Sequence, residues 1–559
     1  MIIGRARKRP RQVCLPHRPR LLTPLISCLR GSLIPIDLDF EGSLMADNPA
    51  HSYDRRKSLL CSGVISQRLL ADSEIRCDVG QVVTIDVLSD DALLAIFDFY
   101  VVPYQDLDLY DAAFSRQRTK KNIESWQLLV HVCRRWRGLV FASPRRLNLQ
   151  LFYEPGKSAR KPRVWPALPL IIKGHVFEAS VDNVIAELGQ RDHITQINLS
   201  LFLSSRSQIE NIWTALQAPF PELAGLFISH EDVSCAAPVL PDSFLGGSAL
   251  RLRYVCFSSI PFPGFPNLLL SSTHLVTLFL SSVPHSGYFS PEAMATCLSV
   301  LTSLEYLLLE FESPQSTPDE KNRRPRSPTL SVLPSLTKFL FKGVNKYLEE
   351  LVARIDTPRI CLLEATFLHD IDFDSPELIR FVSRSSTINS PKKAQVFFDY
   401  RGTSVRLRSQ ASNYFQVGIP WSVPGWQLSS PAQICTASFP LLSRTEKLFI
   451  CEEYNLQVDW EYNAQDIRWL ELLRPFTALR NLYLSKQFAP HFASALREIS
   501  GDGTTAVLYT LENLYVEGFE PSKSVEEDIE RFISARQLTN RPVAISAWEI
   551  DSRHTAYYI

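Results

Sequence analysis

Few residues of this 559-residue chain have types and spacings that could support chemistry. Asp370, Asp372 and Asp374 alternate, so an extended backbone would place their carboxylates on one face, where they could bind a cation. No glycine turn or distal glutamate completes a calcium-binding loop, and a solvated loop or strand edge is the plainer interpretation. His131 has no partner at a metal-binding spacing, and residues 501–503 have the composition of a turn.

Recognised sequence signatures of enzymes are also missing. The chain contains no G-x-S-x-G, no G-x-x-x-x-G-K and no H-E-x-x-H. Its 11 cysteines are dispersed and none is paired as C-x-x-C, which argues against a zinc site and a disulfide framework and favours a reducing compartment, cytosol or nucleus. We therefore expect a protein that is not an enzyme and has no cofactor, no bound metal and no small-molecule substrate.

Charge and hydrophobicity narrow the class of protein further. Lys and Arg number 59, as do Asp and Glu, so the formal net charge is zero and the bulk positive field that attracts nucleic acid is lacking. Hydrophobic residues make up 45% of the chain, enough for most of it to fold, yet no uninterrupted apolar run could span a bilayer. The length exceeds a single compact core, so we expect several domains or a repeat array, with no nucleic acid and no membrane as a partner.

The N-terminal segment, residues 1–80, is predicted to be a disordered tail. It is basic at its start, and the first acidic residue is Asp37. The run at 5–11 is compatible with a nuclear import signal, and the Arg-rich, acid-poor composition also suits an organellar transit segment. The simpler alternatives are a solvated tail or an extension upstream of a shorter product that starts at Met45.

Residues 81–146 are predicted to form a helical module with a polar insert at 104–124. Ser89 can cap a helix, and Asp90 and Asp91 follow in its first turn, where the helix dipole favours negative charge. One continuous helical stretch is expected after the insert, and both stretches carry apolar residues mostly three or four positions apart. The apolar stripes are Leu93, Leu94, Ile96, Phe97 and Tyr100, then Trp126, Leu129, Val130, Cys133, Trp136, Leu139 and Val140.

An apolar sextet, L-x-x-L-x-L, recurs through residues 147–550 and predicts a strand at each recurrence. Where the pattern is clearest, successive sextets start 29, 29, 23, 29 and 32 residues apart, with helical patterns between many of them. This period is typical of leucine-rich repeats, in which stacked units share one continuous core. The expected strands surround Ile197, Leu226, Val255, Leu278, Leu307, Phe339, Leu363, Leu448, Leu482, Leu514 and Ile545, and the expected helices span 182–188, 208–216, 291–301 and 525–536.

Other segments depart from this rhythm. Alternating patterns at 146–151 and 168–172 predict two strands before the first sextet. Residues 390–440 break the period and receive no assignment. Residues 313–328 have the composition of a disordered surface loop, either a tolerated insertion or a site of phosphorylation at the Ser and Thr residues that precede proline.

The helical module resembles an F-box. In that family a Leu-Pro-x-Glu start is followed by Leu-Leu-x-x-Ile-Phe and later by Val-Cys-x-x-Trp, and the corresponding segments here are 88–91, 93–97 and 132–136. Ser89 stands where proline is usual, and the insert at 104–124 is longer than normal. The resemblance implies a short three-helix module that docks on Skp1, and through it on cullin, within a cullin-RING ubiquitin ligase.

Most of the chain is similar to F-box-like proteins of mushroom-forming fungi, as the stretches 165–169, 240–247, 469–477 and 535–538 illustrate. This resemblance implies an α/β fold with an F-box-like module followed by an irregular leucine-rich-repeat horseshoe. It also implies a substrate-recognition adaptor of an SCF-type (Skp1–cullin–F-box) E3 ubiquitin ligase that holds an unknown target protein. The alternative is a repeat scaffold that binds protein without any link to ubiquitin.

Two sets of candidate residues follow from the resemblance. Those expected at the Skp1-binding surface, or in the core beneath it, are Leu88, Leu93, Leu94, Ile96, Phe97, Val130, Cys133 and Trp136. Substrate is expected at the x positions of the sextets, on the concave strand side of the solenoid. These positions are Asn198, Phe227, Cys256, Phe279, Leu308, Leu340, Phe449, Tyr483 and Tyr515.

Overall fold

A computed structural model of the chain describes its folded parts. The described residues are 87–100, 126–144, 146–147, 149–156, 168–232, 236–261, 267–312, 330–368, 375–398, 402–410, 413–420, 430–452, 468–501, 507–518 and 523–548. The expected tail at 1–80, insert at 104–124, loop at 313–328 and the alternating acids at 370–374 all lie outside them. The described residues form two compact units that meet in the sequence between Leu149 and Gln150.

The described residues of the first unit form three helices, α3 (Asp90–Tyr100), α6 (Trp126–Val130) and α7 (Arg134–Ala142). The expected cap of the first helix is confirmed, because the Ala92 amide donates a hydrogen bond to the Ser89 hydroxyl at 3.3 Å. The single helical stretch expected after the insert is wrong. It divides at Cys133, whose backbone is extended (φ −156°, ψ 172°) and whose sulfur accepts the Trp136 amide at 3.4 Å, capping α7.

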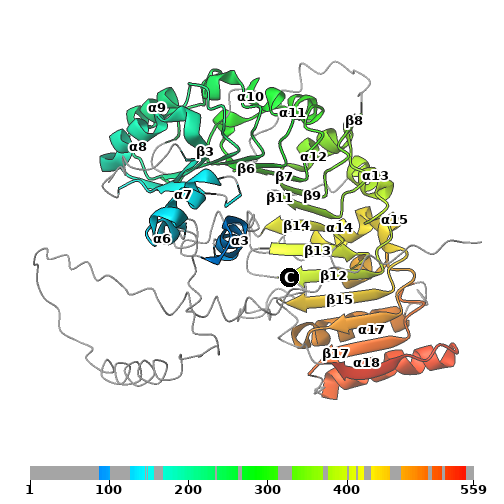
Figure 1. The fold of residues 1–559 in the computed structure, drawn as a ribbon. Helices are drawn as coiled ribbons and strands as arrows, with labels where there is room; N and C mark the ends of the chain where they lie inside the picture. Colours follow the sequence, from blue (N-terminus) through cyan, green and yellow to red (C-terminus); the bar gives the residue numbers. More distant parts are fainter. Residues whose placement is uncertain are drawn as a thin grey trace, which may run out of the picture. The chain divides into compact units, whose positions relative to one another are not determined.

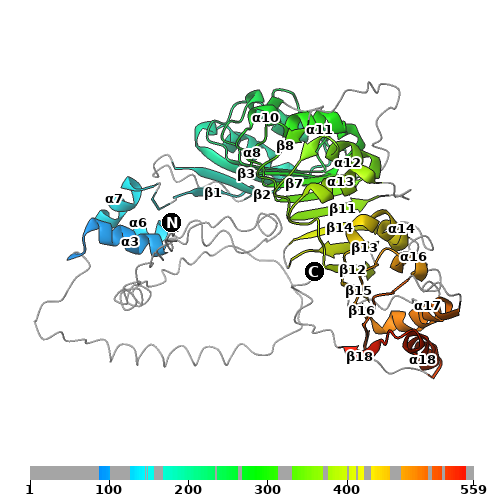
Figure 2. The same cartoon turned by 90° about the vertical axis from the view of Figure 1, so that its right-hand side faces the viewer.

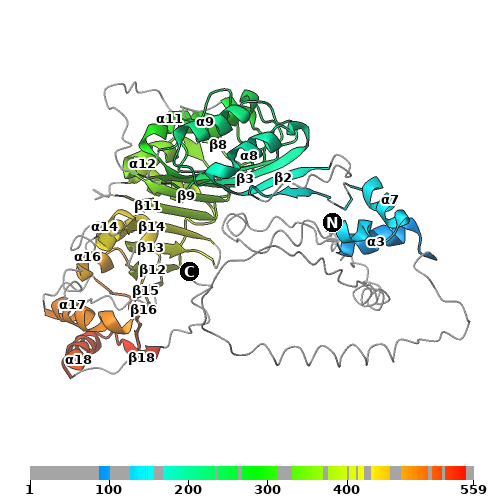
Figure 3. The ribbon, with the colours of Figure 1, turned by 90° about the vertical axis from the view of Figure 1, so that its left-hand side faces the viewer.

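The second unit is α/β, as the sextets predict, and is built on one 16-stranded sheet. In Figures 1, 2 and 3 its helices lie along one face of that sheet. The sheet strands are β1 (Leu151–Tyr153), β2 (Leu170–Val176), β3 (Ile194–Leu201), β4 (Gly225–His230), β5 (Tyr254–Ser258), β6 (Thr277–Val283), β7 (Tyr306–Phe311), β9 (Lys338–Gly343), β11 (Leu362–Phe367), β12 (Lys393–Phe398), β13 (Gly402–Arg408), β14 (Tyr414–Pro420), β15 (Lys447–Glu452), β16 (Asn481–Leu484), β17 (Asn513–Glu517) and β18 (Ala544–Trp548). The helices are α8 (Val181–Leu188), α9 (Arg206–Ala215), α10 (Asn267–Ser271), α11 (Pro291–Leu298), α12 (Asn345–Val352), α13 (Pro376–Arg384), α14 (Ser430–Ala437), α15 (Phe439–Leu442), α16 (Trp469–Leu473), α17 (Ala489–Gly501) and α18 (Lys523–Leu538), and β8 (Ser331–Val332) pairs separately with β10 (Ile355–Asp356).

Most of the expected elements are present close to their predicted bounds. Every sextet coincides with a strand, and the four expected inter-strand helices are α8, α9, α11 and α18. The strand expected at 146–151 is wrong, since only β1, from Leu151, is extended there. The chain before it turns, with the Leu147 amide donating to the Ser143 carbonyl at 3.1 Å.

A reversal interrupts the parallel order in the region that the sextet rhythm left unassigned. The sheet order is β1-β2-β3-β4-β5-β6-β7-β9-β11-β14-β13-β12-β15-β16-β17-β18. Strands β12, β13 and β14 form an antiparallel meander, while β14 pairs in parallel with β11 and β12 with β15 (Figure 1). Gly402 is required where β13 and β14 approach, because a Cβ there would clash with the Ile419 carbonyl oxygen.

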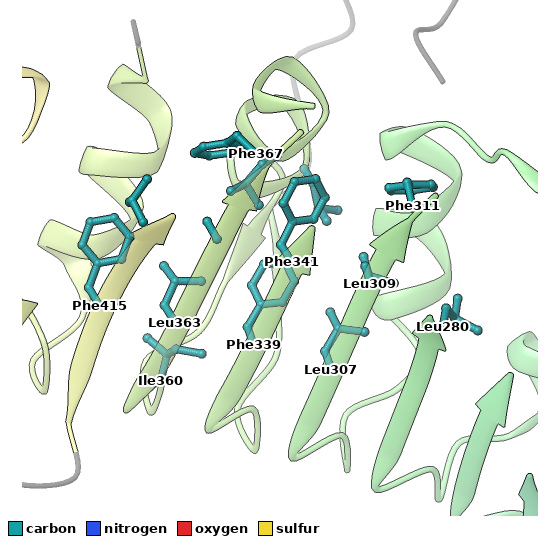
Figure 4. Close-up of a cluster of buried hydrophobic side chains, with 14 of the residues drawn as sticks. Leu280, Leu307, Leu309, Phe311, Phe339, Phe341, Ile360, Leu363, Phe367 and Phe415 are labelled. Atoms are coloured by element: carbon teal, nitrogen blue, oxygen red, sulfur yellow. The ribbon is translucent and has the colours of Figure 1, made fainter. Parts of the chain in front are cut away.

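The core lies between the sheet and its helices. Alternate strand residues point to this side, and Figure 4 shows Leu307, Phe339 and Leu363 aligned on neighbouring strands there. All three are completely buried. Each side chain of this size contributes about 1.5–3 kcal/mol through burial, so one core that continues from strand to strand stabilises the whole unit.

Candidate binding face of the sheet

The face of the sheet opposite the helices carries one continuous row of cross-strand partners. This central row follows the strand pairing from β3 to β17, and the described residues place no helix of this unit over it. In sheet order it comprises Asn198, Phe227, Cys256, Phe279, Leu308, Leu340, Glu364, Gln416, Arg406, Gln395, Phe449, Tyr483 and Tyr515.

All nine residues expected to bind substrate lie in the central row, so the structure brings them together as one register position repeated along the sheet. Phe227 and Phe279 are largely covered, with exposed fractions of 9% and 7%, whereas the other seven are half-buried. The Phe279 ring packs edge-on against Tyr306, with centroids 4.5 Å apart. Packing along the sheet therefore covers these two rings, and the remaining seven residues keep surface for a partner.

A stack of aromatic rings occupies the far end of the central row. The Phe449 and Tyr483 rings are nearly parallel, 3° apart, with centroids separated by 4.2 Å. Tyr515 continues the stack at 4.5 Å and 7° from Tyr483. Trp548 packs edge-on against Tyr483 at 5.4 Å, and its indole N–H donates to the Leu484 carbonyl at 3.0 Å. We call Phe449, Tyr483, Tyr515 and Trp548 the aromatic ladder.

Cationic side chains gather beside this ladder on the antiparallel meander and β15. Arg408 lies directly opposite Lys393, and Lys393 directly opposite Lys447, so three positive charges occupy adjacent positions across three strands. Arg406, in the central row, donates from Nε to the Gln416 side-chain oxygen at 2.5 Å. We call Lys393, Arg406, Arg408 and Lys447 the basic cluster.

Aromatic rings cover part of the basic cluster. The Arg406 guanidinium lies 5.2 Å from the Phe397 ring centroid and 5.0 Å from that of Tyr414. The Lys393 ammonium lies 4.2 Å from the Phe449 ring centroid, which joins the cluster to the ladder. Such contacts stabilise a partly desolvated cation, so the two groups form one surface.

The mutual repulsion of these cations appears in the pKa of Lys393. Burial lowers that pKa to about 8, and the charge of Arg408 is the next largest cause. Lys447 and Arg406 lower it further, whereas Cys451 acts in the opposite direction. Lys393, the central cation of the cluster, therefore begins to lose its proton only slightly above neutral pH.

A carboxyl group lies at the other side of the meander. Burial raises the pKa of Glu364, and both the charge of Arg406 and a hydrogen bond with Tyr414 oppose that rise. Glu364 therefore balances part of the charge of Arg406, but it lies in the row position next to Gln416 and not beside Lys393 or Lys447.

In the helical unit, most residues expected at the Skp1 surface lie in the core. Phe97 and Trp136 contact each other, with ring centroids 4.7 Å apart. Arg135 bridges the start of α3, donating to the Asp90 carboxylate and to the Leu88 carbonyl, both at 2.6 Å. Of the eight residues, Leu93, Leu94, Ile96, Phe97, Val130 and Trp136 are buried, Leu88 is half-buried and Cys133 is exposed.

Other apolar side chains of this unit face solvent instead. Val87, Phe99, Leu128 and Val132 have exposed fractions of 73%, 65%, 49% and 47%. Leu128 and Val132 fall outside the apolar stripe that the sequence predicts: Leu128 lies on α6 beside the buried Leu129, and Val132 lies between the end of α6 and Cys133, which caps α7.

Within the described part of the chain, no three His, Cys, Asp or Glu side chains come together as a metal site. Burial raises the pKa of the Cys256 thiol to about 12, which keeps this row residue protonated at neutral pH. No helix among the described residues has both the length and the apolar character needed to cross a lipid bilayer.

No protein-family model matches this chain, and no curated protein matches it significantly.

Proposed function

We propose that this protein is a substrate-recognition adaptor of an SCF-type ubiquitin ligase, in which an F-box-like helical unit binds Skp1 and a leucine-rich-repeat-like sheet holds the target. The observation that carries the proposal is the combination, in one chain, of a small helical unit with exposed apolar residues and a long sheet face along which one register position repeats from strand to strand. The adaptor would act by proximity, raising the effective concentration of target lysines near a conjugating enzyme.

Support for the Skp1 site comes from the surface of the helical unit. Val87, Phe99, Leu128 and Val132 are exposed apolar side chains on a unit of three short helices. Exposed apolar groups on a small unit can form a surface that a protein partner covers. By contrast, most apolar side chains of the much larger second unit are buried.

Support for target binding comes from the central row. Half-buried Leu308, Leu340, Tyr483 and Tyr515 offer apolar and aromatic contact area, and aromatic side chains are enriched where proteins bind each other. The rigid sheet would hold these groups in fixed positions, so little conformational entropy would be lost on binding.

The test is capture of Skp1 by the full-length tagged protein and by a Leu128→Asp/Val132→Asp variant. Both side chains are exposed, so the variant should fold, while two carboxylates in an apolar interface should abolish capture. Leu250→Asp is the matched control, because Leu250 is a 66% exposed leucine of the second unit. Failure of the unaltered protein to capture Skp1 would contradict the proposal and leave a protein-binding scaffold unconnected to ubiquitin.

A further inference from the structure

Like charges placed directly opposite each other destabilise a sheet, yet this sheet aligns three of them. Arg408, Lys393 and Lys447 are consecutive cross-strand partners on β13, β12 and β15. Arg406 adds a fourth positive charge two residues along β13. A sequence selected for stability alone would alternate the signs of these charges. The alignment of like charges therefore suggests that they bind an anionic partner, whose attraction would offset the repulsion between them.

Carboxylates on the surrounding strands do not lie in this register. Glu364 faces Gln416 across the strands, and its carboxyl interacts with Tyr414 and Arg406. Glu517 on β17 contacts the Lys486 amide at 3.4 Å, and its charge raises the pKa of Cys451 on β15, which Lys393 lowers, so it lies near the cluster but in a different register position. Among the described residues of the meander and β15 that share this face, the balance of charge is positive.

The aromatic ladder next to the basic cluster has a particular orientation. Phe449, Tyr483 and Tyr515 stack face to face across adjacent strands, so both faces of Tyr483 are covered by its neighbours and Phe449 lies against both Tyr483 and the Lys393 ammonium, which leaves ring edges for a ligand there. The edge of an aromatic ring carries the positive part of its quadrupole. An anionic group would therefore be favoured over both the ladder and the cluster, with apolar ring area beside it.

We propose that the basic cluster and the aromatic ladder together bind an acidic segment of a partner protein, one in which Asp or Glu carboxylates alternate with apolar side chains. Carboxylates would pair with Lys447, which is exposed, and with Lys393, which is half-buried behind it. Apolar side chains would lie along Phe449 and Tyr483. This proposal names the class of target that the proposed adaptor would hold. It rests on the proposed function only in the statement that the bound segment belongs to a target for ubiquitin transfer.

A protein segment fits this surface better than a nucleic acid does. Single-stranded nucleic acids bind by stacking bases on open ring faces, and here both faces of Tyr483 are stacked on its neighbours and Phe449 lies against Tyr483 and the Lys393 ammonium. The chain as a whole has zero formal net charge, so the long-range attraction that nucleic-acid binding requires is missing as well.

The experiment measures binding of a fluorescent peptide of repeating Glu-Gly-Leu units to the full-length protein. A peptide of repeating Gln-Gly-Leu units has the same shape without the charge. We expect the Glu peptide to bind, the Gln peptide to bind at least about tenfold more weakly, and the difference to shrink as ionic strength rises. Equal binding of both peptides, or no binding of either, would overturn the proposal.

Variants locate the site. Lys447→Gln changes an exposed residue and should weaken the Glu peptide about tenfold, and Lys393→Met should do the same. Lys338→Gln is the control, since Lys338 is an exposed lysine on the same face of β9, at the position corresponding to Lys393, and it also lies against an aromatic ring. Unchanged binding in both cluster variants, or an equal loss in the control, would contradict the site.

Two further arms separate the alternatives. A polyuridine strand that binds with the same dependence on Lys447 and Lys393 would overturn the choice of a protein partner. Capture of Skp1 is measured on the same preparations. Peptide binding without Skp1 capture would refute the ligase function and keep this site, whereas Skp1 capture without peptide binding would refute this site alone.

Discussion

The ring of Phe97 on α3 packs against the ring of Trp136 on α7, with centroids 4.7 Å apart and planes inclined by 60°. This contact joins the first and last helices of the unit, and both side chains are almost completely buried, with exposed fractions of 0% and 3%. These two residues hold the helices together, so a partner would meet the side chains around them.

Replacement of Phe97 should therefore unfold the helical unit before it affects any interface. We expect Phe97→Ala to cost about 3–5 kcal/mol, because it removes a buried ring and leaves a cavity. Amide hydrogen exchange over α3 and α7 measures the loss. Phe99→Ala, at a 65% exposed position on the same helix, should leave exchange unchanged. Equal protection in Phe97→Ala and in the unaltered protein would show that the contact does not hold the unit.

Cys133 provides a probe of the proposed Skp1 surface in the unaltered chain. It is exposed, and the thiolate is the form that reacts with alkylating reagents. Near neutral pH, iodoacetamide should modify Cys133 faster than the cysteines of the second unit whose thiol pKa is raised by burial, and Skp1 should slow that reaction. Those slower cysteines are Cys256, Cys297, Cys435 and Cys451. Mass spectrometry of tryptic peptides gives the rates, and an unprotected Cys133 in a saturated complex would place the interface elsewhere.

The register of the sheet is tested by a charge placed in its core. Leu278 is completely buried, opposite Val255 and Leu307 on the adjacent strands. Leu278→Asp should remove most of the cooperative thermal transition of the second unit, since an unpaired buried charge costs about 3–5 kcal/mol or more. Leu270→Asp, at a 41% exposed position, should melt close to the unaltered protein. An unchanged transition in Leu278→Asp would contradict this register.

Stability and ligand binding should change in opposite directions at Lys393. Because the pKa of Lys393 in the folded state is about 8, below its usual 10.5, the charged form destabilises the fold at neutral pH. That cost is fully present below about pH 8 and disappears as pH rises toward 10.5. Lys393→Met should therefore raise the midpoint of thermal unfolding at pH 7, by about 1–3 °C given the partial exposure of this group, while weakening the acidic peptide. A lower midpoint would show that Lys393 stabilises the free protein.

The pH dependence of peptide binding follows from the same group. Among the described residues, the side chains that act on the pKa of Lys393 are Arg406 and Arg408 on β13 and Lys447 and Cys451 on β15, and burial raises the pKa of the Cys451 thiol to about 12. The affinity for the Glu peptide should fall from about pH 7 to about pH 9 as Lys393 loses its proton, and Lys393→Met should remove that dependence. A slope that persists in the variant would assign the titration to another group.

The sequence predicted the sheet where its signal was local. Leu278 and Leu280 lie in a sextet that marks both a strand and its buried side, and the structure places them accordingly. The meander escaped prediction because its strands pair antiparallel with partners that no fixed period reveals. Its alternation was nevertheless present: Val405 and Leu407 point to the core, which puts Arg406 and Arg408 on the opposite face.

The candidate site was predictable only in part, because a fixed sequence period reveals some of its residues and antiparallel pairing brings in the others. The aromatic members Phe449, Tyr483 and Tyr515 are x positions of sextets, so their shared face follows from the period. The basic cluster depends on the register that sets Lys393 opposite Arg408, which tertiary pairing fixes and local sequence does not. In the helical unit, the extended backbone at Cys133 likewise divides a stretch whose spacing predicted one helix.

Calorimetric titration of Skp1 into the full-length protein tests the central claim most directly. We expect one-to-one association with a dissociation constant of about 1 µM or tighter, as is usual for an interface of ordinary size, and no association in Leu128→Asp/Val132→Asp. Absence of measurable binding at about 100 µM Skp1, with the helical unit shown to be folded by hydrogen exchange, would contradict it.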